Sequence, residues 1–363
     1  MKICIINIHR MVSSGGSEIQ CDLIARELCN MGHEVVYITP TGTQDSEIFK
    51  RCPYKVVSID DSIVSFYKCL KIERPDIVYW RSYKRLFLPV SIIIRLLGIK
   101  LVFAISHIHD IKPTVFLGYD KKTVKDYLRM LRNMFQTICQ RVGYYNCQAM
   151  TSLNSDYCQL LPKRNVYFVP NAMQPTSQSF YWPRPYCLWV ANLKAPKHPE
   201  LFVKLATEVE RKNIDFLMVG RYQSEFDNLS WILEEDKTPN NFFYLGEQEP
   251  DVVNGMLKDA LFHVHTCEPE GFGNIFIQAW LARKTSVSLK FNPGSVLDGH
   301  IGYFCDDNWN DFIDCCQNLI DNDLLRSSMG DNAYFHAKDL YMPYRLGKQV
   351  NSVLLDTYNS KNE

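Results

Sequence analysis

The sequence lacks several features that would assign a chain to a protein class at once. It has no G-x-G-x-x-G fingerprint, which argues against an ordinary dinucleotide-dependent oxidoreductase. None of its 13 cysteines forms a C-x-x-C pair, so neither a zinc site nor a disulfide framework follows, and we expect reduced thiols that mostly fill small core positions. Low-complexity segments and short-period repeats are also missing.

Long apolar runs are scarce as well. The run at residues 3–8 has the length of a buried strand and not that of a signal sequence, which leads us to expect a cytoplasmic protein. A second run, residues 87–105, is interrupted by Pro89, Arg95 and Lys100. We therefore interpret it as a buried helix followed by a strand and not as a membrane span.

Net charge is zero for the whole chain but not for its halves. Residues 1–180 contain 23 Lys and Arg against 14 Asp and Glu, a net charge of +9, and the remaining residues carry −9. Such an imbalance suggests an anionic partner for the first half.

What the 363 residues do contain is two successive series of strand and helix patterns. In the first half, hydrophobic periodicity predicts strands at 3–8, 34–39, 76–80 and 101–105 and a helix at 17–30. In the second half it predicts strands at 186–191, 216–219, 242–245, 261–265 and 286–289, helices at 199–211, 252–260 and 274–282, and a largely helical tail from 311. This alternation indicates an α/β fold with parallel sheets, and a segment rich in Pro, Ser, Thr and Gln between 170 and 185 marks a domain boundary.

The first segment that could carry chemistry is residues 13–18, between the first strand and the first helix. It contains Gly15 and Gly16. Glycines let a ligand approach the backbone, and the start of a helix favours an anion. The alternative is a plain loop in which Ser17 caps the helix.

The second segment is residues 190–197, where a strand ends and Lys194 and Lys197 follow. Ligands of open α/β sheets bind at such carboxyl ends, and lysine there would neutralise a diphosphate. The alternative is a pair of solvated surface lysines.

The third segment, residues 268–279, places a glycine-rich turn between a strand and a helix. Its N–H groups and the helix dipole suit a phosphate. Glu270 could accept hydrogen bonds from sugar hydroxyls, and Gln278, eight residues later, can donate and accept at a ribose. The alternative is that Glu270 only complements the helix N-terminus and that Gln278 is a surface residue.

In order and spacing, these segments resemble the motifs of retaining family 4 glycosyltransferases, the group 1 type found in bacterial polysaccharide synthesis. Residues 268–279 look like the E-x7-E motif, residues 190–197 like V-G-R-L-x-x-x-K, and residues 169–172 like the interdomain V-P-N-G. Two positions depart from the pattern: Gln278 replaces an acid, and Asn192 replaces a basic residue for which Lys194 could compensate.

The resemblance implies a GT-B fold, in which two Rossmann-like domains face each other across a cleft. Residues 1–172 would be the acceptor-side domain, to which a C-terminal helix at 343–363 returns, and residues 173–342 would bind the donor. The implied reaction moves a sugar from a nucleotide diphosphate sugar to a hydroxyl acceptor with retained configuration, in surface polysaccharide or glycolipid synthesis. No cofactor, no metal and no nucleic acid are expected, and the acceptor would be a saccharide or a lipid-linked saccharide.

The same resemblance assigns roles to residues. Glu270 would contact the donor sugar, Gln278 the ribose and Lys197 the diphosphate. The other donor-binding residues would be Asn192, Gly271, Phe272, Gly273 and Asn274, with Gly15 and Gly16 approaching from the opposite domain. His107 corresponds to a histidine near the reacting sugar, where it could polarise a hydroxyl, and a structural or capping histidine is the alternative.

Residues 121–141 show a basic amphipathic pattern. Its apolar face comprises Val124, Tyr127, Leu128, Leu131, Met134, Phe135 and Ile138, and Lys121, Lys122, Lys125, Arg129 and Arg132 lie mostly elsewhere. Such a helix can lie on an anionic membrane, which makes peripheral contact with the inner face of a membrane a hypothesis. The alternative is a helix whose apolar face packs on the core.

Two rival functions stay open. One is a GT-B epimerase or phosphorylase, which would rearrange or release sugar without a hydroxyl acceptor. The other is a nucleotide-binding or scaffold protein of the same fold that has lost activity, which the departures at Gln278 and Asn192 favour. Donor hydrolysis or transfer by the purified protein would exclude the second.

Overall fold

The structure is a computed structural model. It describes residues 1–13, 15–42, 47–106, 110–111, 124–153, 158, 165–175, 178–209, 213–223, 227–268 and 272–360, without the side chains of residues 124–126, 129 and 130. These residues form two compact units. Unit 1 comprises residues 1–172 and 343–363, and unit 2 comprises residues 173–342.

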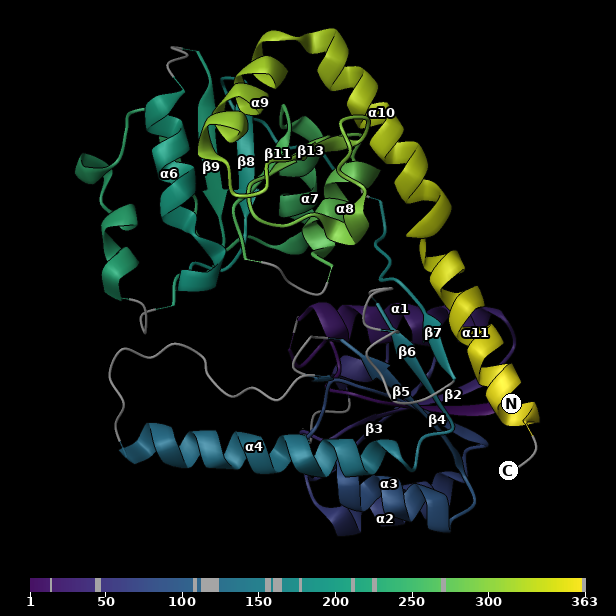
Figure 1. Ribbon diagram of the computed structural model, residues 1–363. Coiled ribbons are helices and arrows are strands. Elements are labelled where there is room, and N and C mark those ends of the chain that lie inside the picture. The colour runs from purple at the N-terminus through teal and green to yellow at the C-terminus, as the bar shows by residue number, and fades with distance from the viewer. Residues whose placement is uncertain are drawn as a thin grey trace. The chain divides into compact units, whose positions relative to one another are not determined.

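Unit 1 is built on a seven-stranded parallel sheet with the strand order β3-β2-β1-β4-β5-β6-β7 (Figure 1). The strands are β1 (Lys2–Ile6), β2 (Glu34–Thr39), β3 (Lys55–Ser58), β4 (Ile77–Arg81), β5 (Lys100–Ile105), β6 (Ala149–Ser152) and β7 (Val166–Phe168). The central strands are buried along nearly their whole length, as expected where helices cover both faces of a parallel sheet.

Helices cover the two faces of this sheet. They are α1 (Gly16–Asn30), α2 (Ile63–Glu73), α3 (Phe87–Leu96), α4 (Val124–Tyr144) and α11 (Pro343–Asn359), with the short 3-10 helix η1 (Glu47–Phe49). One apolar core joins the sheet to α1 and α11, and a second joins its other face to α2, α3 and the end of α4. The final helix thus returns to unit 1, where Gly347 lies so close to α1 that an added Cβ would be 2.4 Å from the Cβ of Glu27.

Unit 2 is built on a six-stranded parallel sheet with the order β10-β9-β8-β11-β12-β13. The strands are β8 (Tyr186–Val190), β9 (Asp215–Val219), β10 (Phe242–Tyr244), β11 (His263–His265), β12 (Ser286–Ser288) and β13 (Gly302–Phe304). Because every strand is parallel to its neighbours, their carboxyl ends meet at one edge of the sheet.

The helices of unit 2 are α6 (Pro199–Glu208), α7 (Pro250–Asp259), α8 (Asn274–Leu281), α9 (Trp309–Asp321) and α10 (Asp323–Leu340). The 3-10 helices are η3 (Ala195–Lys197), η4 (Asp227–Leu233), η5 (Glu235–Lys237) and η6 (Pro293–Ser295). Apolar side chains of α6 and α9 share one core with the sheet. On the other face, Phe276 of α8 packs edge-on against His263 of β11, and the Tyr186 hydroxyl donates to the Met256 carbonyl of α7.

The predicted α/β fold class is confirmed. The predicted strands and helices occur with ends shifted by a few residues, and residues 87–105 form a helix followed by a strand. The sequence analysis did not identify β3, α2, β6, β7 and β13, most of which are short. All thirteen cysteines are free thiols, and eight of them are buried, as expected.

Candidate functional site

At the carboxyl edge of the unit 2 sheet, two strand ends approach each other very closely. Gly220 follows β9 with φ +152°, and a Cβ built on it would lie 1.7 Å from the Ala191 carbonyl oxygen. The Gly220 amide donates to the Gly246 carbonyl (2.9 Å), and the Tyr244 hydroxyl donates to the Gly220 carbonyl (2.8 Å). Only glycine fits this position. The close approach to Ala191 and the hydrogen bonds to Gly246 and Tyr244 hold the ends of β8, β9 and β10 side by side.

Asn192 lies at this edge and is exposed. Its side-chain Oδ1 accepts a hydrogen bond from the Arg221 amide (3.4 Å). The structure therefore places Arg221, which the sequence analysis did not single out, next to the position where the motif has lost its basic residue. The sequence signal for such a role is that a basic residue directly follows Gly220, the glycine after strand β9.

A second loop of this edge, residues 194–198, is fixed by hydrogen bonds from Thr266. The fully buried Thr266 hydroxyl lies 2.9 Å from the Lys197 carbonyl and 3.0 Å from the His198 carbonyl, and it accepts a hydrogen bond from the Trp189 indole N–H (2.9 Å). Thr266 directly follows β11. These contacts fix the backbone at Lys197 against the start of the segment that leads to α8.

Glu268 strengthens the same connection. Its amide donates to the Pro196 carbonyl (2.9 Å), and its Oε1 lies 2.9 Å from His198 Nε2 and 3.4 Å from Lys290 Nζ. The hydrogen bond with His198 and the charge of Lys290 lower the pKa of Glu268 below its ordinary value. Three loops, at 195–198, 266–268 and 290, are therefore joined at one carboxylate.

Helix α8 follows this segment in the chain. Gly273, with φ +77°, is the N-cap residue of α8 and carries no side chain that could satisfy the N–H groups of the first turn. Phe272 is buried against Trp280 and Tyr341, which anchors the turn, and Asn274 begins the helix half-buried. A helix start of this kind is a favourable site for an anion.

Gln278 lies one turn beyond Asn274 on the same side of α8. It is half-buried, and its amide nitrogen donates to Asn254 Oδ1 of α7 (2.8 Å). The carbonyl oxygen of the Gln278 amide keeps its capacity to accept a hydrogen bond from a ligand. Gln278 is thus neither a free surface residue nor a fully buried one.

Three of the expected site residues cannot be placed. Glu270 and His107 lie outside the described residues, as does Gly271 of the turn. Their described neighbours are well anchored: Glu268 and Phe272 as above, and Ser106 by its amide, which donates to Asp110 Oδ2 (2.8 Å). Of the expected donor-binding residues, Asn192 and Lys197 lie in the loop that follows β8 at the carboxyl edge, where Gly220, Thr266 and Glu268 hold its backbone, and Phe272–Asn274 form the start of α8.

Gly15 and Gly16 begin α1 in unit 1. Gly15 is the N-cap residue, and the Glu18 carboxylate folds over it, since a Cβ on Gly15 would be 2.3 Å from Glu18 Oε2. Ser17 does not cap the helix, because its hydroxyl donates to Glu18 (2.9 Å). The start of α1 therefore already has a carboxylate beside it.

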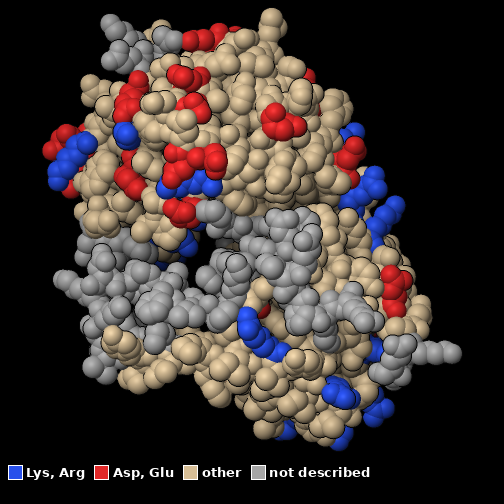
Figure 2. Space-filling model, viewed as in Figure 1, with Lys and Arg blue, Asp and Glu red and all other residues tan. Residues whose placement is uncertain are grey.

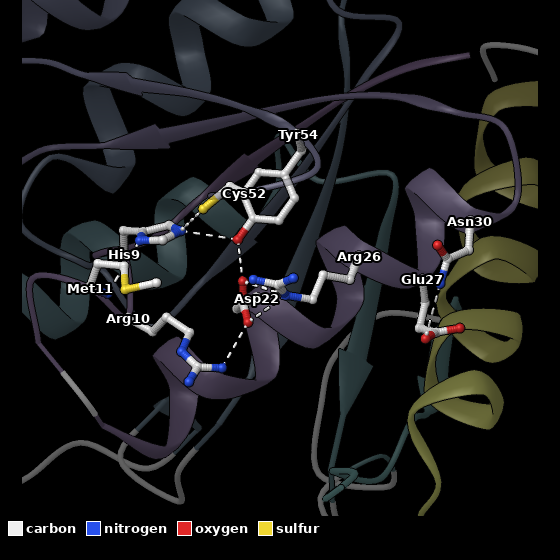
Figure 3. Close-up of polar contacts among 9 residues, drawn as sticks. All are labelled: His9, Arg10, Met11, Asp22, Arg26, Glu27, Asn30, Cys52 and Tyr54. Atoms are coloured by element: carbon white, nitrogen blue, oxygen red, sulfur yellow. Dashed lines mark hydrogen bonds and ion pairs between the residues drawn. The ribbon is translucent and has the colours of Figure 1, made fainter. Parts of the chain in front are cut away.

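Behind this loop lies a buried polar network that the sequence analysis did not recognise (Figure 3). The Asp22 carboxylate is fully buried and accepts hydrogen bonds from Arg10 (2.9 Å), Arg26 (3.0 Å) and the Tyr54 hydroxyl. Burial opposes ionisation of Asp22, but the hydrogen bonds from Arg26 and Tyr54 outweigh it and lower its pKa. The only signal in the sequence was an aspartate on the apolar side of a helix.

His9 extends the network and fixes its own tautomer. Its Nδ1 accepts from the Met11 amide (3.2 Å), so Nε2 carries the proton and donates to the Tyr54 hydroxyl oxygen (3.0 Å). Burial lowers the pKa of His9 to about 4. The network holds the residues that follow β1 in one conformation, and the neutral imidazole is part of it.

Among the described residues, no group of three His, Cys, Asp or Glu side chains could hold a metal ion. One D-x-D triplet, at residues 321–323, joins α9 to α10. Its central Asn322 caps α10 by accepting from the Leu325 amide (3.0 Å), and Asp323 pairs with Arg326 (2.5 Å). This triplet serves the helix junction.

Comparison with known families identifies the unit that contains these loops. Residues 175–336 match the family model described as glycosyl transferases group 1. This match covers most of unit 2 and somewhat less than half of the chain. No curated protein sequence matches the chain significantly.

Solved structures extend the similarity to the whole chain at the level of the fold. Sucrose-phosphate synthase from Thermosynechococcus elongatus superposes with a TM-score of 0.78 at 11% identity, covering 99% of this chain and 100% of that one. Anabaena HepE in complex with UDP and glucose superposes with 0.73 at 14% identity over 98% and 100% of the two chains. A variant of S. aureus TarM, in complex with fondaparinux, α-GlcNAc-glycerol and UDP, gives 0.73 at 12% identity over 99% and 100%. The chain therefore has the GT-B fold of these proteins, and its second half matches the group 1 family model.

Proposed function

We propose that the protein transfers a sugar from a nucleotide diphosphate sugar to a hydroxyl acceptor, with unit 2 holding the donor and unit 1 serving the acceptor. The match of residues 175–336 to the group 1 family supports this proposal. All the unit 2 residues to which the sequence motifs assign a donor contact, from Asn192 to Gln278, lie within the matched range 175–336. At the two positions that depart from the family pattern, Asn192 and Gln278 keep side chains that can form hydrogen bonds with a donor.

The observation that carries the proposal is the junction of the lysine loop with the segment before α8. Thr266 and Glu268 join the backbone at 196–198 to the end of β11, the strand that precedes α8 in the chain. A lysine and the N–H groups of a helix start are complementary to the two negative phosphates of a nucleotide diphosphate. They stabilise the same charge when the diphosphate departs, which is the main electrostatic demand of this transfer.

Uridine nucleotides are the first donors to test. HepE and TarM were both solved with UDP, and both share the GT-B fold of this chain. We infer that the donor is a UDP-sugar and that Gln278 contacts the ribose through the carbonyl oxygen of its amide, since its nitrogen is engaged by Asn254. The Arg221 amide donates to Asn192, and its guanidinium, which lies 4.0 Å from Glu247, is a candidate for the cation that the family motif would carry here.

We keep Glu270 and His107 as the proposed catalytic residues. Glu270 contacts the transferred sugar and His107 lies near the reacting centre, as the family resemblance implies. The transfer retains the anomeric configuration, requires no metal, and serves the synthesis of a surface polysaccharide or glycolipid. In this account the protein's main contribution is to position the donor and acceptor and to stabilise the leaving diphosphate.

A thermal-shift screen against UDP, GDP, ADP, CMP and TDP tests the donor site, because a ligand that binds only the folded state raises the melting temperature. UDP is expected to stabilise the wild-type protein most. Lys197→Ala should weaken UDP binding roughly tenfold, since it removes a charge-assisted contact. Lys204→Ala is the matched control, a lysine of α6 that pairs with Glu208 (3.5 Å), and it should leave UDP binding unchanged. No shift with any nucleotide would refute the proposal.

One observation favours a second function, a nucleotide-binding or scaffold protein without turnover. Gln278 has its amide nitrogen bound to Asn254 and lacks the charge that the family motif carries at this position. Assays of donor hydrolysis and transfer separate the two functions. The second function would be supported if the wild-type protein binds UDP tightly but releases no sugar from the donor, and if Gln278→Glu does not restore this release.

A further inference from the structure

Helix α4 presents a continuous row of large apolar side chains to the outside of unit 1. Leu128 is 62% exposed, Leu131 57%, Phe135 67%, Ile138 58% and Val142 49%. Their spacing of three or four residues places them on one side of the helix, and Tyr127, Met134 and Tyr145 extend the row on its flank. An exposed apolar surface of this extent on a globular protein marks an interaction site.

The inward side of α4 has the opposite character. Asn133, Gln136 and Thr137 are half-buried, and Gln140 is buried. Among the described residues of α4, apolar packing is seen at the C-terminal end, where Gly143 lies against Phe87 and Tyr144 enters the core. A surface helix normally turns its apolar side to the core, so the interpretation of this segment as a core-facing helix is wrong for the described side chains.

Basic residues surround this row. Arg132 and Arg141 flank it on α4, on opposite sides of the apolar stripe, and both are exposed, although one nitrogen of the Arg141 guanidinium donates to the Ile111 carbonyl. The neighbouring helices α2 and α3, which share a core with α4, add exposed Lys68, Lys71 and Arg95. The exposed apolar residues continue there with Ile72 (77%) and Leu96 (80%).

Acidic side chains do not balance these charges. Among the described side chains of α2, α3 and α4, the only acid is Glu73, which is buried and paired with Lys2 (3.2 Å) and Lys55 (2.6 Å). In the view of Figure 2 the surface of unit 1 likewise shows mainly Lys and Arg, whereas Asp and Glu gather over unit 2. A second copy of this chain is a poor partner for such a surface, because two basic faces repel each other.

We propose that the outer surface of α2, α3 and α4 docks on an anionic lipid bilayer. Helix α4 lies along the interface with its apolar row inserted below the headgroups, and Arg132 and Arg141 contact lipid phosphates on either side of it. The interaction is peripheral, because none of the described helices has the length and hydropathy needed to cross a bilayer. The proposal concerns unit 1 alone and does not depend on the proposed sugar transfer.

Flotation of the full-length protein with vesicles tests it. We expect the wild-type protein to float with vesicles of phosphatidylcholine and phosphatidylglycerol at low salt and much less with phosphatidylcholine alone, because added salt or loss of the anionic lipid removes the electrostatic attraction. The double variant Phe135→Gln, Ile138→Gln should reduce the affinity at least tenfold, since it removes two inserted side chains. Arg132→Gln should reduce it about fivefold.

The matched control is Leu324→Gln on α10 of unit 2, a leucine that is 85% exposed and lies outside the proposed surface. It should float like the wild-type protein. All substituted positions are exposed, so melting curves are expected to be unchanged and confirm that the variants fold. If the wild-type protein does not float with anionic vesicles, or if the double variant floats as well as wild type, the proposal is wrong. A dimer in solution that the double variant converts to a monomer would assign the apolar row to a second copy and also overturn it.

Discussion

The hydroxyl of Thr266 offers a sharp test of how the candidate donor site is assembled. It links the end of β11 to the backbone carbonyls of Lys197 and His198, and it is the acceptor of the buried Trp189 indole N–H. Thr266→Val keeps the shape of the side chain and removes these bonds. An orphaned buried donor costs about 1–3 kcal/mol and each lost hydrogen bond about 1 kcal/mol, so we expect a loss of roughly 2–3 kcal/mol in the free energy of unfolding.

Urea denaturation measures this loss. In addition, amide hydrogen exchange in residues 195–200 should accelerate about thirtyfold, which corresponds to ~2 kcal/mol of local destabilisation. Thr207→Val is the matched control, because the exposed Thr207 hydroxyl only donates to a carbonyl of its own helix (3.1 Å), and it should change stability by less than ~0.5 kcal/mol. If Thr266→Val behaves like this control in both measurements, the Thr266 hydroxyl does not hold the loop at 194–198.

Three further predictions concern other parts of the molecule. His9 has a folded-state pKa of about 4 against an ordinary value of 6.5. The stability that its neutral form contributes is therefore complete above pH 6.5 and is lost as the pH falls toward 4, by up to ~3 kcal/mol in the free energy of unfolding. Denaturation at several pH values would measure this loss, and His9→Gln should abolish it. Gly220→Ala should cost about 3 kcal/mol or more, because its Cβ would overlap the Ala191 carbonyl, whereas Gly246→Ala, at φ +68° with nothing nearby, should cost only ~1 kcal/mol. Gln278→Glu should tighten UDP-sugar binding, measured by calorimetry, because a carboxylate accepts more strongly from ribose hydroxyls, and unchanged affinity would remove Gln278 from the ribose site.

The parts of the fold that the sequence predicts well are those with strong periodicity. The pairing of a buried strand with an amphipathic helix is evident for β1 and α1 and again for β8 and α6, and two such series predict the α/β class. Strands β6 and β7 were missed because they have only four and three residues, with polar Thr151 and Ser152 in β6, so their hydrophobic pattern is too short to recognise. The pairing of β6 with β5, and of β7 with β6, is a tertiary effect.

The candidate site was predictable in its loops but not in its contacts. Lys197 and the glycine turn before α8 follow from motif spacing, since both come directly after strands. The role of Thr266 could not be predicted, because it depends on which carbonyl oxygens another loop brings within hydrogen-bond distance. The same holds for Asp22, whose burial requires Arg10, Arg26 and Tyr54 from three other positions in the chain.

The orientation of α4 illustrates a different limit. The sequence shows which residues share its apolar side, but periodicity alone does not say whether this side faces the core or the outside. Here the contacts of Gly143 and Tyr144 fix the rotation of the helix and turn Leu128, Leu131 and Phe135 outward.

The most direct test of the central claim is a crystal structure of the protein with UDP. The account predicts that the diphosphate lies at the start of α8, within hydrogen-bond distance of backbone N–H groups at Phe272–Asn274 and of the Lys197 ammonium group, with the ribose next to Gln278. A nucleotide bound at another edge of the molecule, with this helix start and Lys197 making no contact to it, would contradict the account.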